Sequence, residues 1–201
     1  MSTFDERAQD WDTPERQERA RALAAVIRAG VALTSSTRAI DIGAGTGLLG
    51  LELAGDVGEM VLAEPSAGML EVARAKLATG AWPNVTAVAF DLESDPGPGG
   101  RFDLALSLLV LHHVADTAAA LRAIHALLAP GGRIALLDLD AEDGSFHDED
   151  ATGIHHNGFD RAEIVRLGGV AGLVDLETRT AIEIERDGRA YPLFLLTGRR
   201  P

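Results

Sequence analysis

The stretch that decides the fold is residues 39–47, which read AIDIGAGTG. An apolar run with a single acid, Asp41, leads into three glycines at alternate positions, Gly43, Gly45 and Gly47. Glycine permits positive φ angles and lets the backbone approach a ligand closely. A helix that starts directly after such a turn directs its free N–H groups at that ligand. The pattern therefore predicts a buried strand, a tight turn and a helix that together form a nucleotide-type cofactor site.

Length and composition indicate one globular domain over residues 1–201. Hydrophobic residues make up 46% of the chain, and no apolar run reaches the length of a membrane span, so we expect no membrane association. The first six residues contain neither a basic head nor an apolar stretch, and we expect a cytoplasmic protein without a secretory signal. The absence of cysteine excludes disulfides, thiol nucleophiles and cysteine-ligated zinc.

The formal net charge of −13 comes from 31 acidic residues against 18 lysines and arginines. Such a surface repels phosphate backbones, so nucleic acid is not an expected partner. The charge restricts binding partners and says nothing about the fold.

Strand and helix patterns alternate along the chain. Strands are predicted at 38–42, 60–64, 84–90, 102–107 and 133–139, and helices at 14–30, 46–53, 67–77, 117–128 and 160–169. Ser66, Asp116 and Asp160 stand where N-caps are expected. Residues 173–185 and 190–197 then read as an antiparallel hairpin around Asp187-Gly188. Alternation of this kind predicts an α/β protein whose mainly parallel sheet is covered by helices on both faces.

The glycines fit two cofactor patterns. The dinucleotide fingerprint G-x-G-x-x-G is met by Gly45, Gly47 and Gly50, which would indicate an NAD(P)-dependent oxidoreductase. That register leaves Asp41 without a role. The other pattern takes Asp41 together with the glycines at 43, 45 and 47.

This acid-x-G-x-G-x-G pattern resembles the first motif of the class I S-adenosylmethionine-dependent methyltransferases. The resemblance extends to acids at later strand ends and to residues 127–134, LLAPGGRI, before the fifth strand. It implies a Rossmann-like fold with a seven-stranded sheet that ends in an antiparallel hairpin. It also implies that Glu64 binds both ribose hydroxyls, since a carboxylate accepts two hydrogen bonds at once. The full set of cofactor-binding residues that we predict is Trp11, Asp41, Gly43, Gly45, Gly47, Glu64, Pro65, Met69, Asp91, Leu92, Ser107 and Leu108.

Individual roles follow from the resemblance. Asp41 would anchor the glycine turn and the amino group of the cofactor, although a buried acid that only satisfies turn amides remains the alternative. Asp91 and Leu92 would bind the adenine, with a simple strand-end turn as the alternative for Asp91. Ser107 and Leu108 would line the methionine side of the site.

The N-terminal 30 residues form a predicted helical cap. They open with F-D-x-x-A-x-x-W-D, carried by Phe4, Asp5, Ala8, Trp11 and Asp12, which resembles a group of small bacterial methyltransferases. Residues 153–160 are also similar to that group, whose substrates are generally small molecules. The two aromatic residues either cover the edge of the core or close over the cofactor.

Histidines supply the candidate groups on the acceptor side. His112 follows the fourth strand, and His147 and His155 lie in an acidic loop at 140–158 that we expect to cover the acceptor. For His112 both packing and a role as base are open, since a base is needed only if the acceptor must lose a proton. Histidines among carboxylates allow a metal site, but the spacing fits no standard motif and we predict no metal. The negative field favours a neutral or cationic acceptor.

The predicted function is methyl transfer from S-adenosylmethionine to a small-molecule acceptor at oxygen, nitrogen, sulfur or carbon, with S-adenosylhomocysteine as product. An NAD(P)-dependent oxidoreductase and a non-catalytic binding protein of the same fold are the alternatives. The oligomeric state is not predicted.

Overall fold

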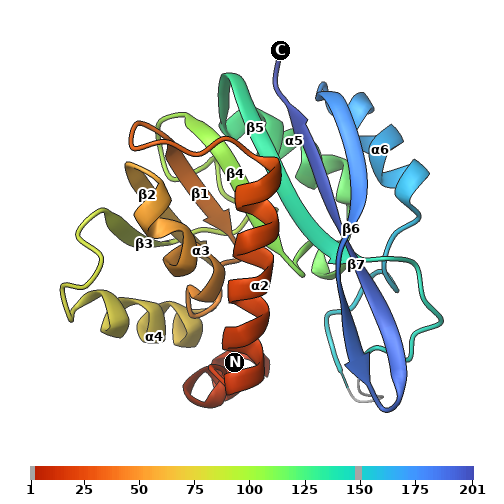
Figure 1. The fold of residues 1–201 in the computed structure, drawn as a ribbon, viewed down its shortest axis with the longest axis horizontal. Coiled ribbons are helices and arrows are strands. Elements are labelled where there is room, and N and C mark those ends of the chain that lie inside the picture. Colours follow the sequence, from red (N-terminus) through yellow and green to blue (C-terminus); the bar gives the residue numbers. More distant parts are fainter. Residues whose placement is uncertain (1–2, 148–150) are drawn as a thin grey trace.

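The computed structural model describes residues 3–147 and 151–201, and these form one seven-stranded sheet in the order β3-β2-β1-β4-β5-β7-β6 (Figure 1). Neighbouring strands from β3 to β5 pair in parallel, and β7 is antiparallel to both β5 and β6. The strands are β1 (Arg38–Ile42), β2 (Glu59–Glu64), β3 (Val85–Ala89), β4 (Phe102–Leu108), β5 (Leu128–Leu139), β6 (Val174–Arg186) and β7 (Arg189–Arg199). The predicted fold class, with its C-terminal antiparallel hairpin, is confirmed.

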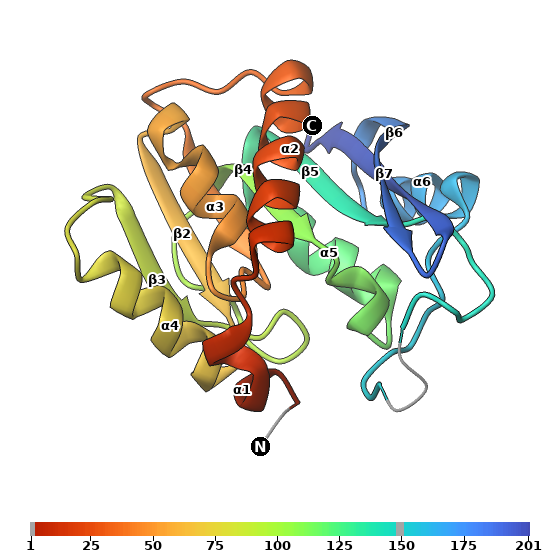
Figure 2. The ribbon, with the colours of Figure 1, turned by 60° about the horizontal axis from the view of Figure 1, so that its bottom comes forward.

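Helices cover both faces of this sheet. The α-helices are α1 (Thr3–Arg7), α2 (Pro14–Gly30), α3 (Leu48–Leu53), α4 (Ala67–Leu77), α5 (Thr117–Leu127) and α6 (Arg161–Val170), and short 3-10 turns lie at Ala8–Asp10, Ala54–Asp56 and Leu111–His113. Buried side chains of α2, α3 and α4 share one hydrophobic cluster, and those of α5 and α6 share the other. Figure 2 shows α1 at the start of α2, beside α4. No helix among the described residues has the length and apolar character needed to cross a membrane.

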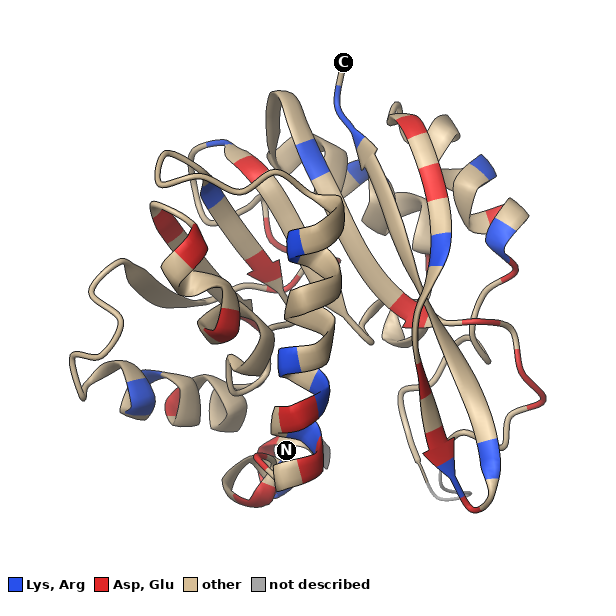
Figure 3. Cartoon of the chain, viewed as in Figure 1, with Lys and Arg blue, Asp and Glu red and all other residues tan. Residues whose placement is uncertain are grey.

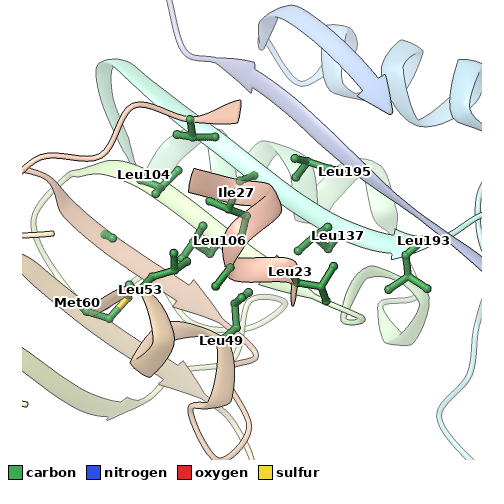
Figure 4. Close-up of a cluster of buried hydrophobic side chains, with 14 of the residues drawn as sticks. Leu23, Ile27, Leu49, Leu53, Met60, Leu104, Leu106, Leu137, Leu193 and Leu195 are labelled. Atoms are coloured by element: carbon green, nitrogen blue, oxygen red, sulfur yellow. The ribbon is translucent and has the colours of Figure 1, made fainter. Parts of the chain in front are cut away.

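The apolar strands are buried on both faces, as expected for parallel strands between two helix layers. In β2, Met60 and Leu62 belong to the cluster under α2 and α3, whereas Val61 and Ala63 belong to the opposite cluster. Figure 4 shows Met60 with side chains from α2, α3, β4, β5 and β7 in the first of these clusters. The sheet is therefore a fixed platform whose loops are free to form a site.

Side-chain caps fix where the helices begin. Oγ of Ser66 accepts a hydrogen bond from the amide of Met69, Oδ1 of Asp116 from Ala119, and Oδ1 of Asp160 from Glu163. Each satisfies an N–H group that has no partner inside its helix, which stabilises a helix by about 1 kcal/mol. The three predicted caps are confirmed.

Two of the differences from the predicted boundaries have a physical reason in the structure. The helix expected from Thr46 begins at Leu48, because Gly47 keeps a φ of 87° and remains in the turn. The strand expected from Arg133 begins at Leu128, because Leu128 already pairs with Phe102 ahead of a register shift. The hairpin turns at Asp187 and Gly188, whose φ angles of 51° and 76° match the two-residue turn that Asp-Gly favours.

Candidate cofactor and acceptor site

A cavity of about 1140 Å³ lies where β1, β2 and β4 end. Its wall comes from the glycine turn, the N-terminal segment (defined as residues 3–13) and α2. Further parts of the wall are residues 64–66, 108–110, 112–113, 146–147, 151–152, 154 and 184–186. Sites for small ligands typically occupy roughly 300–1,000 Å³. The cavity therefore has room for a nucleoside-sized cofactor and a second small molecule.

The glycine turn after β1 needs its glycines. Gly43, Gly45 and Gly47 have φ angles of 65°, 58° and 87°, a region that side chains with Cβ disfavour. A Cβ at position 43 would also lie 2.5 Å from Cγ2 of Val110. The amides of Gly43 and Ala44 donate to the carbonyl of Ala63, which attaches the turn to β2. The turn is held rigidly and presents backbone to the cavity.

Asp41 lies under the turn and is almost completely buried. Its Oδ2 accepts a hydrogen bond of 2.9 Å from the amide of Gly50, in the first turn of α3. Burial raises the pKa of Asp41 to about 7. Asp41 therefore fixes the helix that follows the turn, and its side chain also reaches the cavity wall. The dinucleotide register left this residue without a role, whereas the structure gives it one.

Glu64 connects the end of β2 to the glycine turn. Its Oε2 accepts from the amide of Gly45 at 2.7 Å, and its Oε1 accepts from the amide of Ser66 at 2.8 Å. Burial raises the pKa of this carboxyl. Each carboxylate oxygen has a second lone pair, so two hydroxyl groups of a ligand can still be bound. The arrangement fits the diol of a ribose.

Two carboxylates attach the N-terminal segment to the site. Oδ1 of Asp5 accepts from Oγ of Ser66 at 2.6 Å and from the amide of Gly68 at 2.9 Å. Asp12 bonds the hydroxyl of Thr46 and lies 2.5 Å from Nζ of Lys76. The segment therefore forms a wall of the cavity next to the glycine turn.

Trp11 and Arg16 stand together in this wall. The guanidinium of Arg16 lies 4.0 Å from the centre of the Trp11 ring and donates to its carbonyl at 3.0 Å. Burial lowers the pKa of Arg16. Within the described ranges 3–147 and 151–201, Arg16 has no carboxylate ion-pair partner, although acidic and basic residues crowd the start of α2 (Figure 3).

Sequence reasoning missed Arg16. Its position in the first turn of α2 could have drawn attention to it. A cation there is unfavourable next to the positive end of the helix dipole, so its presence suggests a role outside the helix.

Aromatic and histidine rings form a continuous series in the cavity wall, which we call the aromatic row. Its members are Trp11, Phe4, His113, His112, His147 and Phe146. Successive ring centres are separated by 5.8, 5.3, 4.2, 5.0 and 4.9 Å in that order. The row joins the N-terminal segment to the loop after β5 through the residues that follow β4.

His112 is buried and paired with a fully buried acid. Its Nδ1 lies 2.7 Å from Oδ1 of Asp138, near the end of β5. Asp138 also accepts from the amides of Leu139 and His112, so it acts as an acceptor toward the ring as well. Nε2 of His112 is buried without a hydrogen-bond partner. Sequence reasoning missed this pair, because its members are 26 positions apart.

The predicted lid residues lie in different places. His147 is in the cavity wall, and burial and the neighbouring His112 and His113 lower its pKa to about 4. The side chain of His155 is exposed and outside the wall, but its amide donates to the carbonyl of His112 at 2.9 Å. Residues 148–150 of the predicted lid lie outside the described residues. The described residues contain no group of three metal-ligating side chains.

The remaining predicted cofactor residues divide into two sets. Pro65, Met69 and Leu108 line the cavity, whereas Gly47, Asp91, Leu92 and Ser107 do not. Asp91 accepts from the amide of Glu93 and the hydroxyl of Ser94, which is the geometry of a turn. Ser107 is buried in β4, and its hydroxyl has no partner among the described residues. Their roles toward a ligand stay predictions.

Comparison with known proteins agrees with this geometry. A family profile described as "Methyltransferase domain" matches residues 40–134, which run from the glycine turn through Glu64 and His112 into β5. This part of the chain is a class I S-adenosylmethionine-dependent methyltransferase domain. The cofactor of that family is S-adenosylmethionine.

Curated relatives of this methyltransferase domain include the "Ubiquinone/menaquinone biosynthesis C-methyltransferase UbiE" of Shewanella oneidensis, which is 38% identical over 105 residues. The match covers 50% of this chain and 42% of that protein. The protein of the same name from Coxiella burnetii is 34% identical over 110 residues, which cover 53% and 44% of the two chains. The chain therefore matches less than half of the length of either relative.

Solved structures show the same methyltransferase fold. The YcgJ protein from Bacillus subtilis superposes with a TM-score of 0.71 at 19% identity and covers 89% of this chain and 97% of its own. Phosphoethanolamine N-methyltransferase 2 of Haemonchus contortus, in complex with phosphomonomethylethanolamine and S-adenosylhomocysteine, gives 0.73 at 17% identity, with 90% and 52% covered. A chain from the complex between the Haloferax volcanii Trm112 methyltransferase activator and a methyltransferase gives 0.80 at 19% identity, with 100% and 99% covered.

Proposed function

We propose that this protein transfers a methyl group from S-adenosylmethionine to a small-molecule acceptor. The observation that carries the proposal is Glu64, whose carboxylate lies in the cavity wall between the amides of Gly45 and Ser66. In a methyltransferase domain, an acid at this strand end is suited to bind both ribose hydroxyls. The rigid glycine turn beside it allows close approach of the rest of the cofactor.

The residues of this chain fit the parts of the cofactor in order. When bound, S-adenosylmethionine supplies an electrophilic methyl group, whose bond to the sulfonium sulfur breaks with the electron pair going to sulfur. Glu64 binds the ribose. Asp41 and the amides of the glycine turn would hold the amino-acid part. The guanidinium of Arg16, which has no carboxylate ion-pair partner among the described residues, would bind its carboxylate. The aromatic row would then border the acceptor side of the bound cofactor.

The acceptor occupies the half of the cavity bounded by the aromatic row and by Ile184 of β6. His112 and His147 both belong to this wall and are the histidines that can contact an acceptor. His155 supports the site through its backbone bond to His112. Positioning of two reactants in one enclosed cavity supplies most of the rate of such a displacement.

Calorimetry with S-adenosylhomocysteine tests the proposal. We expect binding in the micromolar range, and we expect Glu64→Gln to weaken it at least tenfold, since one carboxylate oxygen becomes a donor that faces backbone amides. The matched control is Glu71→Gln, a change on the exposed face of α4, which should bind as the wild type does. Thermal stabilisation by NAD or NADP, with none by S-adenosylhomocysteine, would instead support the oxidoreductase alternative.

A further inference from the structure

We propose that the half of the cavity bounded by the aromatic row is the site of a planar acceptor that carries a hydroxyl group, and that Nε2 of His112 accepts the hydroxyl proton. The inference rests on the proposed function and goes beyond it by naming the acceptor chemistry and the base. Asp138 is the positioning residue that fixes the tautomer of His112.

The first argument is the direction of hydrogen bonding at His112. Asp138 accepts hydrogen bonds from two backbone amides and lies 2.7 Å from Nδ1 of the ring. A group that acts as an acceptor at this distance requires the proton to be on Nδ1. In the neutral ring, Nε2 then carries a lone pair, so it can accept a proton but cannot donate one.

The second argument is that this lone pair has no partner. Nε2 of His112 is buried and makes no hydrogen bond within the described residues, and Nε2 of His147 has the same status. Buried polar atoms are almost always paired, so an unpaired nitrogen in a cavity wall is available to bond a ligand group. A hydroxyl group is the simplest partner for an acceptor nitrogen, and it also contains the proton that a base would remove.

The third argument concerns the shape and charge of the wall. Phe4, His113, His147 and Phe146 present flat rings on either side of His112. The pKa values of His113 and His147 are lowered by burial, so these rings are neutral at pH 7. Rings of this kind pack well against another planar ring, by offset or edge contacts. The rings of the aromatic row therefore favour a planar compound.

The proton transfer balances without a further reagent. The O–H bond of the acceptor breaks, the proton goes to Nε2, and the electron pair stays on the oxygen, which uses it for the bond to the methyl carbon. The imidazolium that results is stabilised by Asp138 at Nδ1. Loss of that proton to water afterwards returns His112 to its starting tautomer.

The experiment uses the full chain labelled with ¹⁵N at histidine and saturated with S-adenosylhomocysteine. The nitrogen chemical shifts distinguish a ring nitrogen that bears a proton from one that has a lone pair, and His112→Gln assigns the signals. We expect His112 to be protonated at Nδ1 and Asp138→Asn to redistribute the proton between both nitrogens. Phenol should shift the Nε2 signal strongly, whereas anisole, the same ring without a hydroxyl proton, should leave it nearly unchanged.

His125, on α5 outside the cavity wall, is the internal reference, and its signals should not respond to either compound. A proton on Nε2 of His112, or equal effects of phenol and anisole, would overturn the inference. If S-adenosylhomocysteine binds and phenol has no effect, only the acceptor chemistry is wrong. If S-adenosylhomocysteine itself does not bind, the proposed function fails as well. Should Asp138→Asn not fold, the wild-type tautomer and the phenol–anisole comparison still decide the question.

Discussion

Asp12 and Lys76 form an ion pair of 2.5 Å that joins the N-terminal segment to α4. The side chains are only 25% and 22% exposed, and Lys76 also donates to the carbonyl of Thr46 at 2.7 Å. The pair is therefore shielded from water more than an ordinary surface pair and lies next to the glycine turn. The pair therefore fixes the N-terminal segment against the glycine turn.

We predict that Asp12→Asn loosens this segment and weakens S-adenosylhomocysteine binding by about fivefold, or roughly 1 kcal/mol. Amide exchange over residues 3–13 should become faster, while the midpoint of global unfolding changes little. Glu163→Gln, which breaks the exposed pair with Arg166 on α6, is the control and should alter neither quantity. Unchanged exchange in Asp12→Asn would contradict the prediction.

Gly43 has a positive φ and no room for a Cβ, whereas Gly131 has a positive φ and open space around it. Alanine substitutions at the two positions therefore distinguish the cost of backbone strain from the cost of a steric clash. Gly131 has a φ of 78° with nothing within 4 Å of an added Cβ, so Gly131→Ala should cost only the backbone strain of about 1–2 kcal/mol. Gly43→Ala should cost roughly 1–3 kcal/mol more, because its Cβ would meet Val110 at 2.5 Å. Urea denaturation measures the free energy of unfolding of both variants. If both lost the same amount of stability, the side chain of Val110 would have moved aside at no energetic cost, and the prediction would be wrong.

Asp41 makes stability depend on pH. Its pKa is raised from 3.8 to about 7, so between these values the folded state keeps a proton that the unfolded state releases. The stability associated with this group is present below pH 4 and is lost as the pH rises toward 7, by on the order of 4 kcal/mol. Asp41→Asn keeps an oxygen that can accept from Gly50 and removes the titration. We therefore expect the variant to gain stability relative to the wild type as the pH rises from 4 to 7, measured by urea denaturation.

Arg16 is predicted to recognise the carboxylate of the cofactor. Arg16→Gln should weaken S-adenosylhomocysteine binding about tenfold, since a charge-assisted hydrogen bond contributes roughly 1.5–3 kcal/mol. Binding of 5′-methylthioadenosine, which lacks the amino-acid group, should be unaffected by the same change. Arg21→Gln, on the exposed face of α2, serves as the control. Equal losses for both ligands would place Arg16 elsewhere in the site.

Local sequence signals predicted most of the fold. The glycine turn, the caps at Ser66 and Asp116 and the Asp187-Gly188 hairpin each depend on residues within a few positions of one another. A predicted boundary was wrong where the pairing partner lies far away in the sequence. The first residue of β5 is Leu128 and not Arg133, because Leu128 pairs with Phe102 of β4. The resemblance to the methyltransferases pointed to Asp41 and Glu64 as cofactor residues, and both lie in the cavity wall where the parallel strands end. Their roles toward the cofactor stay predictions.

The acceptor side was harder to predict, because its contacts join distant parts of the chain. Asp138 pairs with His112, and Arg16 of α2 stacks on Trp11 of the N-terminal segment. Neither arrangement follows from spacing or periodicity. The turn at Asp91 shows the opposite case, since its short-range bonds to Glu93 and Ser94 were foreseeable and were given as the alternative.

Because Trp11 lies in the cavity wall, its intrinsic fluorescence can report ligand binding. The chain contains two tryptophans, and the second, Trp82, packs against the core before β3 and is not part of the wall. Trp82→Phe would therefore leave a single indole beside Arg16 and the glycine turn. Its fluorescence would change when a ligand displaces water from the cavity, so binding could be followed by rapid mixing without any label.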